Sequence, residues 1–442
     1  MIRRIIAASF SLLAAAASAA PLYHSMGPNL PFGDVAHGQS IMAGINNPAA
    51  GATAIRDDGD TVQFGIWNGF GVGYEVGEVD NLFDTIDQQI DDLQNSVVVG
   101  STQQELENDI SATVNSLNET LRSIDESGNY KAFVSVHLPI VPLLVSSDFL
   151  GGTIVFDGHM SAATNAHVLQ DDVQFISLND PNDDINYDGG TQTFTVENND
   201  STLLAKGTLN TELSLGYSRE LLSTPLGKLY AGVRGKYLRV GLIRLNERLV
   251  DVVDSESVFD NIDDYDYTDS TAVGLDAGLL LIASHYRIGA TLNNVNEPSF
   301  EFNDIINAGS YNTSGEVYRE LAADNEYVME SQLKLEGALY TEDQNWIISV
   351  GMDANAVEDA LGDEYQWATV SAAYVNEGFI LPGLRFGMRQ NLAGTELNYL
   401  TAGLTLFGAL NLDLAYGTDS VEVDEESVPQ GLMFNLGLDV TF

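Results

Sequence analysis

The sequence predicts an all-β protein, a 14-stranded antiparallel transmembrane β-barrel with an N-terminal hatch and an extracellular helical hairpin. Three observations carry this prediction. Apolar residues alternate with small or polar ones in many segments, the connections between these segments alternate between long and short, and 44 of the 64 acidic residues fall in the six long connections. A soluble β-sandwich has no reason to segregate acid in this way. A transmembrane barrel has short turns on one side and long polar loops on the other. A large soluble β-protein is the alternative.

Residues 1–20 predict a secretory signal peptide. Arg3 and Arg4 precede an apolar run from Ile5 to Ala17, and Ala17-Ser18-Ala19 offers the small-x-small pattern of a cleavage site. The alternative is a membrane anchor, but the run is shorter than the ~20 apolar residues that a spanning helix needs. No later segment reaches 18 unbroken apolar residues.

Residues 21–60 precede the first strand and are rich in turn signals. Gly27-Pro28 and Pro31-Phe32-Gly33 fall in this segment, and Asn46-Asn47-Pro48 follows them. The segment is too long for a simple tail. We therefore expect a hatch, or plug, folded into the lumen.

Residues 61–442 predict the barrel. In the first strand the apolar residues Val62, Phe64, Ile66 and Phe70 share one parity, and glycines and Gln63 occupy the other. This period of two is typical of a strand with one apolar and one polar face. Fourteen segments show the pattern: 61–77, 129–138, 150–163, 203–220, 227–243, 272–282, 286–297, 328–340, 345–355, 368–376, 383–391, 398–406, 410–417 and 431–442. An even number fits a barrel whose two ends lie on the periplasmic side.

The first long connection, residues 79–128, has a helical period instead. Apolar residues recur at helical spacing in two runs that Gly100-Ser101 separates: Phe83, Ile86, Ile90, Leu93 and Val97, then Leu106, Ile110, Val114, Leu117, Leu121 and Ile124. We expect a helical hairpin in the first extracellular loop. Two arrangements remain open, namely helices that pack only on each other and a cap over the barrel mouth.

Composition excludes several function classes. The net charge of −46 argues against direct nucleic-acid binding, which needs clustered Lys and Arg. The absence of Cys excludes disulfides, Cys-ligated zinc and a thiol nucleophile. The chain carries none of the common catalytic motifs, and its six His show no metal-ligand spacing, so we do not expect an enzyme. The acidic loops are interpreted either as solvation or as a face that bridges divalent ions to lipopolysaccharide or to a partner cell.

One acidic stretch suggests a cation site. Asp184, Asn186 and Asp188, followed by Gly189, match the opening of a calcium-binding loop, in which oxygen ligands recur at alternate positions. The acid expected at loop position twelve is replaced by Thr195. A structural calcium ion is the hypothesis, and an ordinary acidic turn is the alternative. No other cofactor is expected.

Basic residues cluster in the fourth and fifth predicted strands. Arg234 and Lys236 share the parity opposite the apolar row, so we expect both side chains in the lumen. One interpretation is lumen charge paired with an acid such as Glu212. The other is a constriction that selects an anionic solute.

The last strand alternates to a terminal aromatic residue, Phe442, on the same face as Phe434 and Val440. This ending is similar to the signal that the barrel assembly machinery reads in bacterial outer-membrane proteins. We therefore expect the outer membrane of a Gram-negative bacterium, with outer-membrane lipids and lipopolysaccharide as neighbours.

The arrangement resembles the long-chain fatty-acid and aromatic-hydrocarbon transporter superfamily (FadL-like barrels), with fourteen strands and an N-terminal hatch. Asn47, Pro48, Ala49 and Ala50 are similar to the Asn-Pro-Ala stretch of its N-terminal region, which implies that these four are hatch residues. A closer resemblance, to the outer-membrane family of TraF-type conjugal transfer proteins, rests on three stretches: Val76–Gln94, Tyr286–Phe300 and Gly383–Leu392. Since the chain has no Cys, the thioredoxin-like fold of the F-plasmid protein of that name is not expected.

Three functions are possible for such a barrel, of which the resemblances imply the first two. The first is hatch-gated passive uptake of a small hydrophobic or amphipathic molecule. The second is a structural or surface-interaction protein, with a closed barrel, in cell-to-cell transfer. The third, a water-filled porin, is disfavoured by the expected plug. An apolar pocket beside the hatch favours the first function, and a lumen filled by side chains favours the second.

Overall fold

A computed structural model describes residues 41–54, 62–66, 69–147, 149–252, 267–376, 380–423 and 426–438. The predicted signal peptide, most of the 21–60 segment and Phe442 lie outside these ranges.

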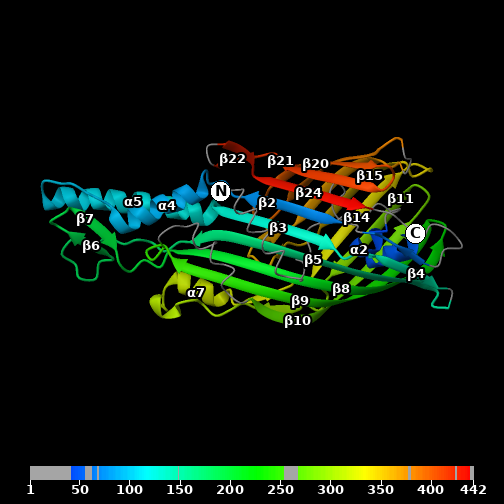
Figure 1. Cartoon of the computed structure of the whole chain (residues 1–442), viewed down its shortest axis with the longest axis horizontal. Coiled ribbons are helices and arrows are strands. Elements are labelled where there is room, and N and C mark those ends of the chain that lie inside the picture. The colour runs from blue at the N-terminus through cyan, green and yellow to red at the C-terminus, as the bar shows by residue number, and fades with distance from the viewer. Residues whose placement is uncertain are drawn as a thin grey trace.

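Within these ranges fourteen antiparallel strands form one closed ring (Figure 1). In ring order from the first strand they are β2 (Phe70–Val76), β3 (Asn129–His137), β5 (Gly152–Leu169), β8 (Thr202–Thr224), β9 (Gly227–Arg248), β10 (Thr268–Ile282), β11 (Tyr286–Asn293), β14 (Gln332–Tyr340), β15 (Trp346–Asp353), β18 (Trp367–Tyr374), β19 (Gly383–Asn391), β20 (Asn398–Leu406), β21 (Leu410–Gly417) and β24 (Gly431–Leu438). The ring closes where β2 pairs with β24, with Phe70 opposite Leu436. Each predicted segment contributes one strand, in the predicted order.

The two faces of the wall differ as the alternation predicts. On β9 the side chain of Val233 points outward and is 60% exposed, whereas Arg234 points into the lumen and is 7% exposed. The outward row continues around the ring with residues such as Val350 and Phe386, both more than half exposed. A closed ring leaves no unpaired strand edge, which is what hydrocarbon requires of a spanning backbone. None of the described helices is long and apolar enough to cross a membrane.

The predicted strand 61–77 is wrong in its first part. Only β2 joins the ring, whereas β1 (Val62–Phe64) pairs with β4 (Leu143–Ser147), a short strand on the edge of β5. The amide of Gly65 donates to the carbonyl of Pro142 at 3.0 Å and continues this side pairing. Alternation indicates that a segment is a strand, but it does not specify the strand with which that segment pairs. The apolar pattern runs on from β1 to β2, so the sequence alone predicts one strand where the structure has two.

The long connections hold further elements that the sequence did not predict. Four are two-stranded antiparallel sheets: β6 (Ile185–Asp188) with β7 (Thr193–Val196), β12 (Ser299–Glu301) with β13 (Glu326–Val328), β16 (Val357–Glu358) with β17 (Glu364–Tyr365), and β22 (Ser420–Val423) with β23 (Glu426–Pro429). The helix α7 (Glu316–Ala323) and the short 3₁₀ turn η4 (Ala308–Ser310) lie between β12 and β13.

The predicted helical hairpin is present as α4 (Leu82–Asn95) and α5 (Gln103–Ser127). At the start of α5 the hydroxyl of Thr102 accepts from the amide of Glu105, and the Glu105 carboxylate accepts from the amide of Ser101. The first bond satisfies an amide that the first helical turn leaves free, and the second holds the residue before the cap.

The two helices do not pack only on each other. Their apolar faces share one core with β7 and with the ends of β5, β8 and β9, and Gln94 donates to the carbonyl of Val252 at 3.0 Å. In Figure 1 the helices and the β6–β7 hairpin extend beyond the barrel along the long axis of the molecule, rather than across its end. We call α4, α5, β6 and β7 the extracellular arm, and the end of the barrel that carries it the extracellular end, after the side on which the sequence predicts the helical hairpin.

Candidate functional site

The lumen contains the hatch segment. Three short elements, α2 (Ala43–Asn46), η2 (Pro48–Ala50) and α3 (Gly51–Ala54), lie inside the barrel near the end opposite the arm (Figure 1). Asn47 caps η2, because its side-chain Oδ1 accepts from the amide of Ala49 at 3.0 Å. Proline at the first position of such a turn has no amide left to satisfy. The described residues thus place all four predicted hatch residues in the interior, where each is buried.

The hatch rests on two glycines of the wall. Gly232 on β9 and Gly278 on β10 are cross-strand partners that face the lumen. A Cβ on Gly232 would lie 2.2 Å from the Pro48 carbonyl oxygen, and one on Gly278 would lie 2.2 Å from Oδ1 of Asn47. No real side chain tolerates such contacts, so these two positions let the hatch backbone approach the wall directly.

Three polar contacts fix the position of the hatch. Nδ2 of Asn47 donates to the carbonyl of Leu279 at 3.2 Å and to the Glu336 carboxylate at 3.1 Å. The guanidinium of Arg234 donates to the carbonyl of Ile45. The predicted hatch motif and one predicted basic residue therefore meet in a single contact region.

The predicted basic pair shares one carboxylate. Arg234 and Lys236 both point into the lumen, and Asp276 on β10 lies between them, with Oδ2 2.7 Å from the Arg234 guanidinium and Oδ1 2.9 Å from Lys236 Nζ. Lys236 also donates to Oδ1 of Asn294 at 2.6 Å. The suggested partner Glu212 acts on Arg234 only through longer-range attraction. Since both cations already pair with a carboxylate, the geometry favours structural charge over an anion constriction.

A second closure lies on the extracellular side, where residues 357–365, the inward hairpin, fold into the lumen. Lys131 on β3 binds the carboxylates of Asp359 and Asp363, the latter at 3.0 Å, and donates to the Tyr365 hydroxyl at 2.7 Å. The side chains of Lys131, Asp359 and Tyr365 are buried, and that of Asp363 is 11% exposed.

The inward hairpin is tied to the wall a second time through Glu75 on β2. The hydroxyls of Tyr365 and Tyr399 donate to its two carboxylate oxygens, each at 2.7 Å. Sequence reasoning missed this network, because a loop that folds inward has the same acidic composition as one that folds outward. The one available signal was a pair of charges, Glu75 and Lys131, on the polar faces of neighbouring strands.

A pocket of about 480 Å³ opens beside the inward hairpin at the extracellular end. It lies between the end of α5, the inward hairpin and the 394–397 turn, and its lining includes Asp125, Asp363 and Glu396. Beside the hatch, the space lined by Asn46, Glu336 and Trp367 is only about 20 Å³, which suits roughly one water molecule. Neither space is an apolar pocket of the kind that a hydrophobic solute requires.

The predicted calcium residues lie in the extracellular arm. Asn186 and Asp188 belong to strand β6, and Asp184 directly precedes it. The Asp188 carboxylate caps the following turn, where it accepts from the amide of Gly190 at 2.9 Å and from the Thr191 hydroxyl at 3.0 Å. An extended strand spreads its ligands along one face instead of wrapping them around an ion. Calcium binding here stays a prediction.

Comparison with solved structures finds distant similarities. The TodX deltaS2S3 mutant monoaromatic hydrocarbon channel is 11% identical, with 90% of this chain and 93% of that chain covered and a TM-score of 0.37. The transport unit of the autotransporter AIDA-I from Escherichia coli is 8% identical, with 92% and 100% covered and a TM-score of 0.26. CdiB from Acinetobacter baumannii is 7% identical, with 87% and 60% covered and a TM-score of 0.28. These similarities are too distant to indicate function.

No curated protein sequence matches the chain. A family model described as F plasmid transfer operon, TraF, protein matches residues 44–353, from the hatch motif to the ninth ring strand. That stretch includes the two wall glycines under the hatch, Gly232 and Gly278 (the glycine patch), together with the basic pair and the extracellular arm. With well over half of its length matched, this outer-membrane-type barrel belongs to the family described as F plasmid transfer operon TraF proteins.

Proposed function

We propose that the protein is a closed barrel in the outer membrane of a Gram-negative bacterium and acts as a surface-interaction protein through its extracellular arm. The observation that carries this proposal is the hydrophobic core that α4 and α5 build outside the ring. Phe194 of β7 and Leu203 of β8 are fully buried in it. This hydrophobic core stabilises the arm outside the barrel. A pore needs no such structure to conduct, so the arm indicates a contact outside the cell.

The state of the lumen supports the same proposal. The hatch occupies one end of the lumen and the inward hairpin the other. Buried ion pairs such as Arg385–Asp413 take up further space inside the barrel. A lumen filled by its own side chains is the feature expected of the surface-interaction function.

The charge of the arm indicates the chemistry of its partner. Acidic residues dominate the outer loops, so a partner presents either cationic groups or phosphate groups bridged by divalent ions, as in lipopolysaccharide. The family description names plasmid transfer, which supports cell-to-cell transfer as the process that uses such a contact.

The helical part of the arm can be excised without disturbing the register of the β2–β3 ladder. The amide of Gly77 donates to the carbonyl of Asn129 at 2.7 Å, and Glu78 pairs with Ser127, so the two ends of the insertion are adjacent. A variant in which Asn-Gly replaces residues 79–127 closes the β2–β3 ladder with a two-residue turn. We expect it to form the barrel, seen as fast migration in unheated gels, and to lose cell-to-cell transfer or cell adhesion. Unchanged transfer in cells that carry this variant contradicts the proposal.

A second candidate, hatch-gated uptake of small hydrophobic or amphipathic molecules, is favoured by the way the hatch is held. The hatch is held by its close fit against two glycines and by two sets of polar contacts. A ligand that competes for these contacts can displace the hatch. Single-channel conductance in planar bilayers separates the candidates, with the full chain compared to a chain that lacks residues 21–60. Conductance by the shortened chain alone supports uptake. Silence of both supports the closed barrel, and conductance by the full chain contradicts it.

A further inference from the structure

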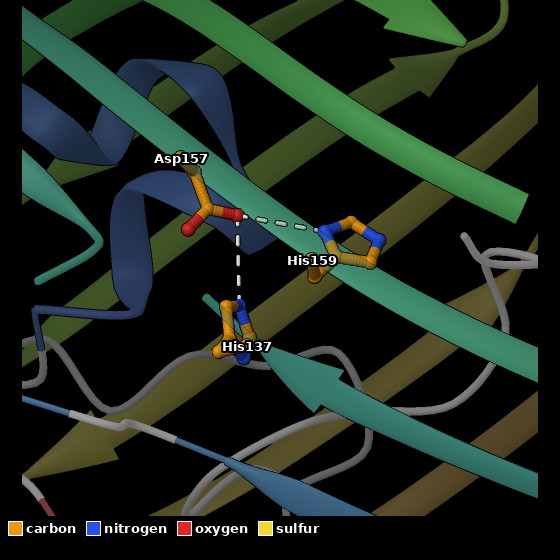
Figure 2. Close-up of side chains that lie close together, drawn as sticks. All are labelled: His137, Asp157 and His159. Carbon is orange, nitrogen blue, oxygen red and sulfur yellow. Dashed lines mark ion pairs between the residues drawn. The ribbon is translucent and has the colours of Figure 1, made fainter. Parts of the chain in front are cut away.

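Three buried polar side chains meet on the lumen wall close to the hatch (Figure 2). His137 ends β3, and Asp157 and His159 lie two residues apart on β5, so the two β5 side chains share one face. The spacing of the two His along the chain indicates no metal site. The antiparallel register nevertheless makes His137 and His159 direct cross-strand neighbours.

The three groups point their polar atoms at one another without forming hydrogen bonds. Nε2 of His137 lies 3.5 Å and Nδ1 of His159 lies 3.6 Å from the same oxygen of Asp157, as the dashed lines of Figure 2 show. Both of these nitrogens and both carboxylate oxygens are buried and have no hydrogen-bond partner among the described residues. Buried polar atoms are rarely left unsatisfied, so this cluster calls for a further partner.

The separations fit a bound metal ion. Ligand atoms about 2.0–2.1 Å from a tetrahedral zinc ion stand roughly 3.3–3.4 Å apart, close to the two distances that join Asp157 to the imidazoles. All three ligand atoms lie within 4.8 Å of one another. Two imidazoles and one carboxylate are a donor set that first-row divalent transition metals prefer over calcium or magnesium.

We propose that His137, Asp157 and His159 bind one divalent transition-metal ion, for which zinc is the reference probe. Glu212 on β8, the cross-strand neighbour of His159, is the fourth candidate ligand, since it is buried and one of its oxygens has no partner among the described residues. With neutral imidazoles, the carboxylates of Asp157 and Glu212 carry two negative charges, which a divalent ion cancels. Arg234, whose charge acts on His159, shares the single carboxylate of Asp276 with Lys236, so this pair leaves one positive charge against the two carboxylates.

The metal would join two strands where they support the hatch. Val155, two residues before Asp157 on the same lumen face, packs against Ile41 and Met42 of the hatch segment. A metal bound to both β3 and β5 fixes this part of the wall. The proposal does not depend on whether the barrel conducts.

Metal binding is tested on the purified full chain in detergent. After chelator treatment, zinc is titrated by calorimetry in excess magnesium, which occupies carboxylate clusters on the acidic surface but competes poorly for imidazole. The variants Asp157→Asn and His159→Gln remove single ligands. His285→Gln, which changes an exposed His in a short turn, is the matched control.

The expected result is one zinc per chain for the wild type and for His285→Gln, and an affinity at least ~10-fold weaker for each ligand variant. No binding by the wild type at millimolar zinc, or equal binding by all four proteins, overturns the proposal. In that case the cluster is an ion pair of protonated imidazoles with Asp157.

A second measurement keeps the test valid where a ligand variant fails to migrate as a folded barrel. X-ray absorption at the zinc edge of the loaded wild type is expected to show two imidazole ligands. A shell of oxygen atoms alone overturns the proposal.

Discussion

The hatch and the inward hairpin both fill the lumen, but different forces hold them. The hatch contributes no ionisable side chain between residues 41 and 54 and rests on Gly232 and Gly278 by shape. The inward hairpin brings Asp359 and Asp363 to a buried lysine, and Tyr365 to a buried glutamate. A contact held by shape fails when volume is added. A contact held by charge fails when one partner is removed, because the others stay buried without compensation.

The largest effect is expected from Lys131→Met. The substitution keeps the side-chain volume but leaves Asp359, Asp363 and Glu75 without their shared cation, at a cost of about 3–5 kcal/mol in the free energy of unfolding. Urea unfolding in detergent measures it.

The matched control for that experiment is Lys228→Met. Lys228 pairs with Glu220 at 3.0 Å on the exposed end of β9, where water screens the two charges and the salt bridge contributes little to stability. Equal losses for the two lysines would remove the distinction between a charge-held and a shape-held closure.

A smaller effect is expected from Gly232→Val, which adds volume beneath the hatch. Its Cβ would overlap the Pro48 carbonyl, so we expect the hatch to leave the wall at a cost of about 1–3 kcal/mol. Because the chain has no Cys, the variant Thr53→Cys on α3 can report hatch position through its rate of thiol labelling. Labelling should accelerate in the Gly232→Val background.

Gly235→Val is the control on the same strand, since a Cβ at Gly235 meets nothing within 4 Å. Acceleration by both glycine variants would mean that β9 as a whole, and not the glycine patch, positions the hatch.

The smallest effect is a pH response confined to the extracellular side. Burial, helped by the charge of Glu126, raises the pKa of Asp125 at the end of α5, and burial together with the charge of Asp125 raises the pKa of Glu320 on α7. Because both carboxyls bind protons more tightly in the folded chain, stability rises as the pH falls through their pKa values and is lower near neutral pH.

Hydrogen exchange of residues 316–323 measures this response between about pH 7 and pH 4. Both carboxylates keep much of their surface in water, so solvent screening limits the gain to less than about 1 kcal/mol. We expect Asp125→Asn to flatten it and residues 43–54 to change less. An equal response in the two segments would contradict a pH response confined to the extracellular side.

The sequence predicts the wall well because alternation reports the face of every strand residue locally. It predicts a lumen position for Arg234 and Lys236. It does not identify Asp276 as their partner, because pairing depends on register between strands. It also gives no sign that Asp359 turns inward, or that His137 and His159 become neighbours, since both facts depend on contacts between residues far apart in the chain.

The seam between β2 and β24 sets an order of assembly. In every other ladder of the ring, the two paired strands are successive ring strands along the chain. The seam instead joins the first ring strand to the last, with Phe70 opposite Leu436. Contacts of such long sequence separation form slowly. The hatch contacts β8, β9 and β10, whose ladders join neighbouring segments of the chain and do not need the seam to be closed. It can therefore settle against an open, curved sheet and be enclosed when the last strand meets the first, without having to enter a finished cylinder.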